Sequence, residues 1–534
     1  MFSFAILIGI YSYLVFILGI LGLIEKKYIL LLTLFFLFLS AIYFLKFKPK
    51  KSIHLNNLFK DKLTFFLLLL FLFQALVNLI GVLGPELGFD ALWYHLTLPK
   101  LYIQNHSVLR IPGSLLYYSD MPKLTEMLYT ASIFFGNEIL AKLVHFSFGL
   151  LSSIALYFLS RKFFNVKLSM LAVLIFYANL VVGWESISAY IDLARTFFEI
   201  MALWGFINFI ESENEKWLIE SAVMIGLSVS TKILSLGSIG IFLCMIIYFG
   251  LSNHKKNVKV FIDVLIFIFF SLLIPLPWFI FSFVHTGNPL YPMFSNIASL
   301  NYNISILNPV KFTLDVLKLL IYSPDPLSPL YLIFLPLILL TFNRFKESIK
   351  FILLYSLLAM VIWYFTPRVG GGRFILPYLP AFSIFCVQII KMFEKKTEYG
   401  RLFIFLVIFI SLLSISYRGI VNAKFIPVII GKESKSHFLS SHLNFSFGDF
   451  YDTDGYFKKN ISLKDTVLLY GFHNLYYVDF PFIDSSWVKK GDIFNYIATQ
   501  NSNLPKRFSN WNLVYSNPKI HVNLHSLGGA PWVY

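Results

Sequence analysis

The chain has 534 residues, of which 57% are hydrophobic and only 13% are charged, and its mean hydropathy is +0.73. A soluble protein has no means of hiding that much apolar surface, so the composition excludes a soluble globular protein and indicates a polytopic helical membrane protein. The formal net charge of +16 does not indicate a nucleic-acid partner, because the lysines gather in short connectors between apolar runs, as they do in cytoplasmic loops.

Thirteen apolar runs are long enough, or nearly long enough, to cross a membrane as helices. A hydrocarbon core about 30 Å thick requires roughly 20 apolar residues in a helix. Because some runs are short, the sequence predicts an all-α polytopic membrane protein with about 11–13 transmembrane helices. The runs lie near 3–24, 28–46, 62–83, 139–160, 168–184, 190–210, 217–231, 233–251, 258–282, 329–343, 349–366, 373–392 and 402–418.

Basic connectors set the orientation of these spans. When the spans alternate in direction, the Lys- and Arg-rich connectors fall on one side, which the positive-inside rule makes cytoplasmic. These connectors are 46–51, 161–167, 254–259, 343–350 and 391–401. The segments predicted to lie outside are 84–138, 184–190, 283–328, 366–373 and the tail from about 419.

The chain is predicted to have three parts. Residues 1–61 hold two N-terminal spans, and residues 62–418 form a transmembrane domain with the outer loops 84–138 and 283–328. Residues 419–534 are predicted to form a small extracytoplasmic α/β domain, because "DTVLLYGFHNLYYVDFPF" (465–482) alternates apolar and polar residues, which is typical of strands. The run "FTLDVLKLLIY" (312–322) is too short to span, and its pattern predicts a helix along the membrane interface.

Asp90 is the first candidate functional residue, six or seven residues past the third span in "GPELGFDALWYHLTLPK" (84–100). Trp93 and Tyr94 follow it, and both residue types prefer the membrane–water boundary, which would hold the loop on the bilayer. A carboxylate held there suits a general base acting on an acceptor hydroxyl or amine while a lipid-borne donor approaches. The alternative is that Asp90 only caps a helix that begins at Ala91, since Asp is a preferred N-cap.

A second group of charges lies in "WESISAYIDLARTFFE" (184–199). Glu185 falls in a short outer loop and Asp192 begins the next span, so both are candidates for chemistry. Asp192, Arg195 and Glu199 share a helix face. Ionisable groups within a span are functional candidates unless they pair, and Arg195 with Glu199 is equally consistent with a self-neutralising structural pair.

Three cations are predicted to lie at outer boundaries. Lys232 in "SVSTKILSLG" (227–237) sits between two spans, and Arg368 and Arg373 flank a glycine run. Glycines let a backbone approach a ligand closely, and the arginine fork suits phosphate oxygens. These residues are candidates for holding a lipid phosphate, and each is also consistent with a snorkelling anchor.

Metal and hydrolase motifs are absent from the sequence. His95, His145, His285 and His473 show no ligand spacing with other His, Cys or acidic residues, so no zinc site is predicted. The sequence also contains no Walker loop, GxSxG or HExxH pattern.

Several blocks of the sequence together resemble bacterial GT-C glycosyltransferases. These are the polyprenyl-phosphate-sugar-dependent enzymes related to protein O-mannosyltransferases and the lipid A aminoarabinose transferase. The similarity covers about 62 to 420, and the order of the blocks is more specific than any single block. The blocks are "FDALWYHLTLPKLY", "YSDMPKLTEMLY", "AYIDLARTFFEIMALWG", "GLSVSTKILSL", "GNPLYPMF" and "GGRFILPYLPAFS".

The resemblance implies a role for each candidate residue. Asp90 would be the acceptor-activating carboxylate, and Asp192 with Glu185 would supply the second acidic position. Lys232 and Arg373, with Arg368 beside them, would hold the phosphate of the donor. The remaining candidates are assigned to the sugar or acceptor pocket: Tyr94, His95, Glu86 and Glu126.

The function implied is a single displacement at the outer face of a bacterial inner membrane. A sugar would move from a polyprenyl-phosphate donor to a lipid, glycan or protein acceptor, with membrane lipids as further partners. Because Ala91 follows Asp90 where some relatives have a second acid, we expect no metal or other cofactor to be required, with a divalent cation as the alternative. The main rival function is a transporter or flippase of lipid-linked sugars, which would place its charges near the membrane midplane.

Overall fold

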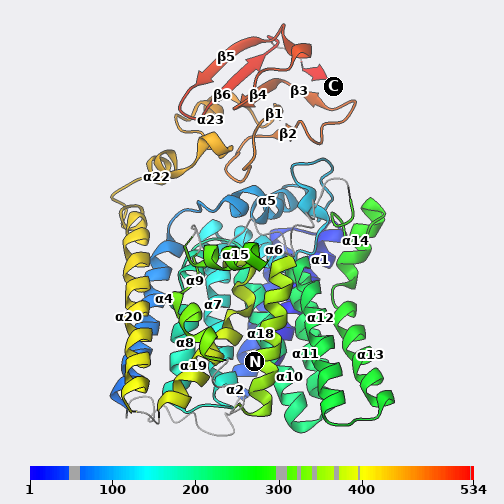
Figure 1. Ribbon diagram of the computed structural model, residues 1–534. Coiled ribbons are helices and arrows are strands. Elements are labelled where there is room, and N and C mark those ends of the chain that lie inside the picture. Colours follow the sequence, from blue (N-terminus) through cyan, green and yellow to red (C-terminus); the bar gives the residue numbers. More distant parts are fainter. Residues whose placement is uncertain are drawn as a thin grey trace.

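The long apolar runs of the sequence fold into helices that stand side by side in a bundle (Figure 1). A smaller domain containing a β-sheet covers one end of the bundle, and we call this end the outer end. The predicted fold class, an all-α membrane protein with a small C-terminal α/β domain, is confirmed. The computed structural model describes residues 1–46, 61–295, 309–321, 326–338, 345–365, 372–394, 397–528 and 531–534.

Nine helices within the described ranges are long and apolar enough to cross a membrane. Their outward leucines and phenylalanines stay exposed, as suits contact with lipid tails. Helix α11 (Glu215–Thr231) has 17 residues and is slightly shorter than these nine. The nine are α1 (Phe2–Ile20), α2 (Lys26–Lys46), α4 (Lys62–Leu83), α7 (Glu138–Ser160), α10 (Asp192–Ser212), α12 (Leu236–Ser252) with its leading turn η3 (Ile233–Ser235), α18 (Glu347–Phe365), α19 (Leu379–Glu394) with its leading turn η8 (Leu376–Tyr378), and α20 (Thr397–Asn422), which continues through η9 (Ala423–Phe425) into α21 (Ile426–Ile429).

One predicted span, 258–282, is a bent pair of helices. Helices α13 (Asn257–Leu273) and α14 (Leu276–Thr286) meet at an angle of 59°. Pro275 and Pro277 lie at this break, and proline has no N–H to continue the helical ladder. The hydropathy pattern alone did not reveal the bend.

Two further predicted spans are also interrupted. The run 168–184 divides into α8 (Val166–Tyr177) and α9 (Leu180–Glu185), because the Asn179 side chain accepts a hydrogen bond from Val181 N and starts a new helix. The run 329–343 begins as α16 (Pro329–Phe334) and η5 (Leu335–Leu337), and its last residues lie outside the described part of the chain.

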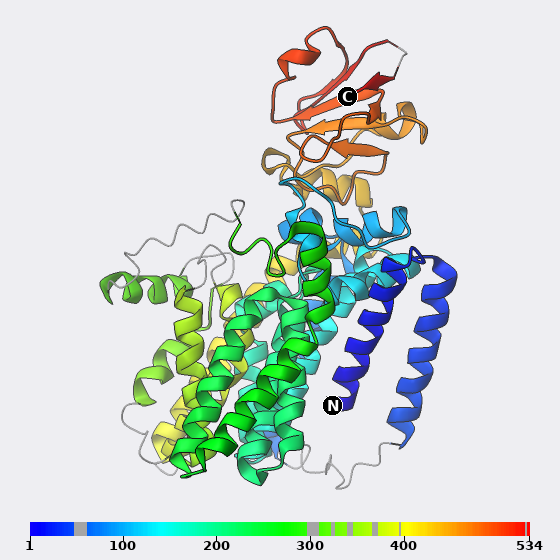
Figure 2. The same cartoon turned by 90° about the vertical axis from the view of Figure 1, so that its right-hand side faces the viewer.

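Helices α1 and α2 form a hairpin at the side of the bundle, shown in blue in Figure 2. The Tyr11 hydroxyl and Thr33 Oγ1 join the two helices at 2.8 Å. Phe2 packs against the rings of Trp204 and Trp217, which attaches α1 to the bundle.

Short helices cover the outer end beneath the C-terminal domain. One amphipathic helix, α15 (Pro309–Ile321), lies across the bundle axis in Figure 1, exposes Val310 and Leu314, and pairs Lys318 with Asp315 at 3.6 Å. An amphipathic helix is therefore present where the sequence predicted one. The other short elements are η1 (Ala91–His95), α5 (Thr97–Gln104), η2 (Tyr117–Asp120) and α6 (Leu124–Phe135).

The C-terminal domain is built on a mixed five-stranded sheet in the order β2-β1-β4-β6-β5. Strand β1 pairs in parallel with β2 and β4, whereas β6 is antiparallel to β4 and β5. Strands β3 and β7 form a separate antiparallel pair. The elements are α22 (Lys435–His442), η10 (Phe445–Phe447), α23 (Tyr456–Asn460), β1 (Val467–Tyr470), β2 (Phe482–Asp484), β3 (Ile493–Phe494), β4 (Tyr496–Gln500), η11 (Lys506–Phe508), β5 (Asn512–Asn517), β6 (Val522–Ser526) and β7 (Trp532–Val533).

The outer loop 84–138 and the C-terminal domain share one hydrophobic core. Leu92 and Tyr102 of the loop belong to the same buried cluster as Leu469 and Phe472 of the domain. A second cluster fills the helical bundle, and a third lies around Phe494 and Trp511 in the C-terminal domain. The shared core fixes the domain against the loop that carries Asp90.

Candidate active site

Four charged side chains from four separate segments meet at the outer end of the bundle. Arg373 Nη1 lies 2.7 Å from Asp90 Oδ2, and Arg373 Nε lies 3.9 Å from Asp192 Oδ2. Lys232 Nζ donates to Asp192 Oδ1 at 2.6 Å. We call Asp90, Asp192, Lys232 and Arg373 the charged cluster. The structure thus brings together four residues that the sequence had marked separately.

Asp90 occupies the N-cap position of η1 without acting as a cap. Its side chain makes no capping hydrogen bond; instead Oδ2 accepts from the Tyr94 hydroxyl at 3.3 Å and from Arg373. The side chain is 16% exposed. The capping alternative is therefore wrong, and the carboxylate is directed to the charged cluster.

Element η1 is a π-helical turn, in which Leu96 N donates to Ala91 O at 2.9 Å. Such wide turns are rare and occur often at functional sites. Tyr94, a predicted pocket residue, is buried beside Asp90. Burial and the neighbouring Asp90 carboxylate raise the pKa of the Tyr94 hydroxyl, which keeps it a hydrogen-bond donor.

Asp192 and Glu185 lie at neighbouring helix ends, and both are buried. His145 of α7 holds this region, since its Nε2 accepts from Leu193 N at 3.0 Å while Nδ1 donates to Ser188 O at 2.8 Å. The first turn of α10, which carries Asp192, is thereby tied to α7.

Arg373 is held as a cation by the acids around it. Burial alone would lower its pKa, but the carboxylates of Asp192, Asp90 and Glu185 outweigh burial and hold the pKa well above its ordinary value. Its guanidinium also lies over the Tyr190 ring, 5.1 Å from the centroid. Arg368, the other predicted arginine, lies outside the described residues.

Glu86 braces the Asp90 loop. Its Oε1 accepts from Leu87 N and Gly88 N at 2.9 and 2.7 Å, and its Oε2 accepts from Ala189 N at 2.6 Å. These bonds tie the loop to the segment just before Asp192. The pocket role assigned to Glu86 stays a prediction, whereas the bracing bonds are present.

Lys142 supports the same loop from α7, and the sequence interpretation did not single it out. Its Nζ donates to the carbonyl oxygens of Gly81, Gly84 and Pro85 at 2.9, 2.7 and 3.3 Å. These acceptors are at the C-terminal end of α4, where carbonyls lack helical partners. A lysine within an otherwise apolar run was the available signal.

His95 and Glu126, the other predicted pocket residues, bond to each other. His95 Nδ1 lies 2.8 Å from Glu126 Oε1, and Lys123 Nζ lies 3.9 Å from the same oxygen. All three side chains are buried. Their part in a substrate pocket also stays a prediction.

Arg195 and Glu199 form an ion pair inside the bundle, at 3.6 Å. Arg195 Nη2 donates to the Tyr378 hydroxyl at 2.9 Å, and Glu199 accepts from Ser238 and Tyr355 hydroxyls at 2.5 and 3.1 Å. The surroundings therefore satisfy both charges, as the structural-pair interpretation expects.

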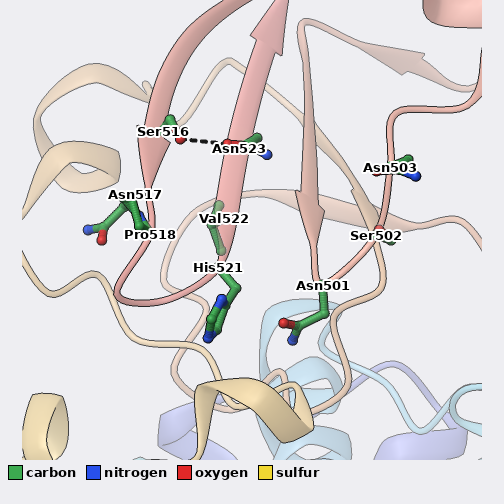
Figure 3. Close-up of a pocket in the computed structure, with 9 residues that line it drawn as sticks. All are labelled: Asn501, Ser502, Asn503, Ser516, Asn517, Pro518, His521, Val522 and Asn523. Atoms are coloured by element: carbon green, nitrogen blue, oxygen red, sulfur yellow. Dashed lines mark hydrogen bonds between the residues drawn. The ribbon is translucent and has the colours of Figure 1, made fainter.

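Within the described residues, no group of three or more His, Cys, Asp or Glu side chains is placed to hold a metal ion. A pocket of about 380 Å³ does occur in the C-terminal domain (Figure 3), and its lining includes no residue of the charged cluster. The lining is polar and carries the Ser516 to Asn523 hydrogen bond at 2.7 Å. Its residues are Asn501, Ser502, Asn503, Ser516, Asn517, Pro518, His521, Val522 and Asn523.

Comparison with known proteins supports the sequence resemblance. Residues 127–281 match the family model described as dolichyl-phosphate-mannose-protein mannosyltransferase. No curated protein matches the sequence.

Solved structures share the fold. The crystal structure of ArnT from Cupriavidus metallidurans bound to undecaprenyl phosphate superposes with a TM-score of 0.55 and 10% identity, over 87% of this chain and 98% of that chain. The apo state of the same protein gives a TM-score of 0.53 and 12% identity, over 86% and 97% of the two chains. The predicted resemblance to the GT-C glycosyltransferases is thus confirmed: the chain has their fold over most of its length, and a segment of it matches one of their sequence families.

Proposed function

We propose that the protein transfers a sugar from a polyprenyl-phosphate donor to a lipid, glycan or protein acceptor at the outer end of the bundle. The observation that carries this proposal is the charged cluster, in which Arg373 contacts both Asp90 and Asp192 while Lys232 contacts Asp192. Two cations beside a partly exposed carboxylate suit a reaction in which a phosphate leaves and a hydroxyl loses a proton.

The lipid nature of the donor follows from the setting. The cluster lies where membrane helices end, and a related fold, that of ArnT from Cupriavidus metallidurans, was solved with undecaprenyl phosphate bound. A donor anchored in the bilayer would bring its phosphate to Lys232 and Arg373 from the membrane side. We place the protein in a bacterial inner membrane with this end facing outward, in keeping with the basic connectors at the opposite ends of the spans.

The proposed chemistry is one displacement. The acceptor hydroxyl gives its proton to Asp90, and its oxygen forms a bond to the anomeric carbon. The bond from that carbon to the phosphate oxygen breaks, and the electron pair leaves with the lipid phosphate. The phosphate gains one negative charge as it departs, so Lys232 and Arg373 stabilise the transition state more than the bound donor. The two side-chain cations supply this stabilisation, and the step as written uses no metal ion.

Asp192 and Glu185 act in this scheme by placing the cations. Asp192 bonds Lys232 at 2.6 Å and lies 3.9 Å from Arg373, and Glu185 helps to hold the pKa of Arg373 high. Both acids are buried, which suits positioning rather than contact with a bulky acceptor.

Replacement of Asp90 tests the proposal. Asp90→Asn keeps the shape and removes the base, so we expect transfer of radiolabelled sugar from the lipid donor in membranes to fall at least 100-fold. Asp120→Asn is the matched control, because Asp120 is an acid of the same loop that pairs with Arg110 at 3.4 Å instead. Full activity of the Asp90→Asn protein at a normal protein level would overturn the assignment.

The alternative is a transporter of lipid-linked sugars, for which the Arg195–Glu199 pair within α10 is the specific observation. A transporter leaves its cargo intact, so the same assay separates the two functions. Movement of the intact lipid-linked sugar, with no sugar released from its phosphate, would favour the transporter.

A further inference from the structure

The C-terminal domain reaches the Asp90 loop through residues 472–479. Lys100 Nζ donates to Tyr476 O and Val478 O at 2.7 and 2.6 Å. Tyr476 N donates to Leu92 O at 3.3 Å, and the Tyr477 hydroxyl donates to Glu86 O at 3.1 Å. Glu86 and Leu92 bracket Asp90 in the chain, so the domain is fixed on both sides of the proposed base.

His473 belongs to this docking segment and contacts the residues next to Asp90. Its ring stacks on Phe89, with centroids 4.8 Å apart, and lies 4.3 Å from the Trp93 ring. Phe89 is 37% exposed and His473 is half-buried. The three rings therefore form an accessible aromatic cluster from two domains, which we call the aromatic platform.

The platform connects to Asp90 through stacked tyrosines. Trp93 lies 5.0 Å from Tyr118, which stacks on Tyr94 at 3.8 Å. The Tyr94 hydroxyl in turn donates to Asp90. A ligand resting on the platform would thus lie beside the carboxylate that the proposed reaction uses.

A chain of hydrogen bonds sets the orientation of His473. Asn474 Nδ2 donates to Asp449 Oδ1 at 2.5 Å, so the amide oxygen of Asn474 is the atom that faces His473 Nδ1 at 2.9 Å. Nδ1 must then carry the proton, which makes Nε2 of the neutral ring an acceptor. In the described part of the chain, no residue bonds to Nε2. Asn474 and Asp449 are both buried, so the relay is built into the domain.

We propose that His473, Phe89 and Trp93 form an acceptor subsite for a sugar ring, with His473 Nε2 accepting a hydrogen bond from a ring hydroxyl. This inference rests on the proposed function and deepens it, because it makes the acceptor a carbohydrate, either a glycan or the head group of a glycolipid. It also assigns the C-terminal domain a direct part in substrate binding.

The chemistry of the platform favours a carbohydrate over a peptide. The C–H face of a sugar ring packs against aromatic faces, and its hydroxyls donate to an acceptor nitrogen. Trp93 Nε1 is already bonded to Leu115 O at 2.9 Å, which leaves the tryptophan to offer apolar surface. The 472–479 contacts consume their backbone groups in docking, and the platform presents rings rather than a strand edge that an extended peptide would pair with.

A binding assay without donor tests the subsite independently of catalysis. Purified full-length protein in detergent is applied to an array that carries immobilised oligosaccharides and immobilised peptides. His473→Phe keeps the ring that stacks on Phe89 and Trp93 and removes Nε2, and His473→Ala removes both. The matched control is His437→Phe, because His437 is exposed on α22 and pairs with Glu433.

We expect the wild-type protein to retain oligosaccharides and not peptides. His473→Phe should bind them about tenfold more weakly, the loss of one hydrogen bond, and His473→Ala more weakly still, while His437→Phe binds normally. Equal binding by His473→Phe and wild type, retention of peptides alone, or retention of no glycan by wild type would each overturn the proposal. Asp90→Asn should bind the array normally, so failure of the catalytic assignment remains distinguishable from failure of this subsite.

Discussion

Replacement of Arg373 by Lys probes the charged cluster most finely. Arginine reaches Asp90 with Nη1 at 2.7 Å and faces Asp192 with Nε at 3.9 Å, which requires a planar fork. Lysine keeps the charge but has a single nitrogen, so it gives up one of the two carboxylates. The loss of one charge-assisted hydrogen bond is about 1.5–3 kcal/mol, which corresponds to a fall in kcat/KM of about 10- to 150-fold.

The assay is transfer of labelled sugar by protein in liposomes, with donor and acceptor varied separately. Because the departing phosphate gains charge at Arg373, we expect kcat to fall more than the KM for acceptor rises. Arg110→Lys is the matched control, since Arg110 faces Asp120 at 3.4 Å in the same loop and lies outside the cluster. Arg373→Lys activity within threefold of wild type would refute the proposed role of the arginine fork.

Two stability predictions follow from buried groups outside the chemistry. Lys142→Met should destabilise the protein by about 2–4 kcal/mol, because three carbonyl oxygens at the end of α4 lose their donor, whereas Lys162→Met, which breaks a partly exposed pair with Glu211, should cost less than about 1 kcal/mol in thermal unfolding; equal effects would contradict the role of Lys142. Burial raises the pKa of Asp484 in β2 from 3.8 to about 6, so the folded state holds that proton more tightly, and stability present below pH 4 should be lost as the pH rises through 6, by about 3 kcal/mol. Hydrogen exchange of the β1 and β2 amides in the intact protein measures this loss, and Asp484→Asn, which stays neutral, should remove the pH dependence.

The residues of the charged cluster were predictable because two independent patterns marked them. Basic connectors placed the ends of the spans on one side, and the ordered sequence blocks marked Asp90, Asp192, Lys232 and Arg373 at those ends. Their mutual distances were not predictable, since they depend on how four segments pack. Hydropathy likewise located the helices but not their interruptions at Asn179 and Pro275, which depend on single capping and N–H-deficient residues.

The contact between the C-terminal domain and the Asp90 loop left no trace in the sequence. Lys100 and Tyr476 are separated by 376 positions, and no local period or spacing relates residues that far apart. His473 was noted only as a histidine without metal-ligand spacing, because its partners Phe89 and Trp93 come from the other end of the chain. Glu86 was noted for its charge alone, whereas its bonds to backbone N–H groups depend on the fold of the loop.

The central claim is that sugar moves from a lipid phosphate to an acceptor in one displacement at the charged cluster. The most direct measurement uses purified protein in liposomes and a donor of known anomeric configuration, and determines the linkage of the product by NMR spectroscopy. The account predicts that sugar leaves the lipid phosphate and that the product has the inverted anomeric configuration. A donor that stays intact, or a product with retained configuration, would contradict it.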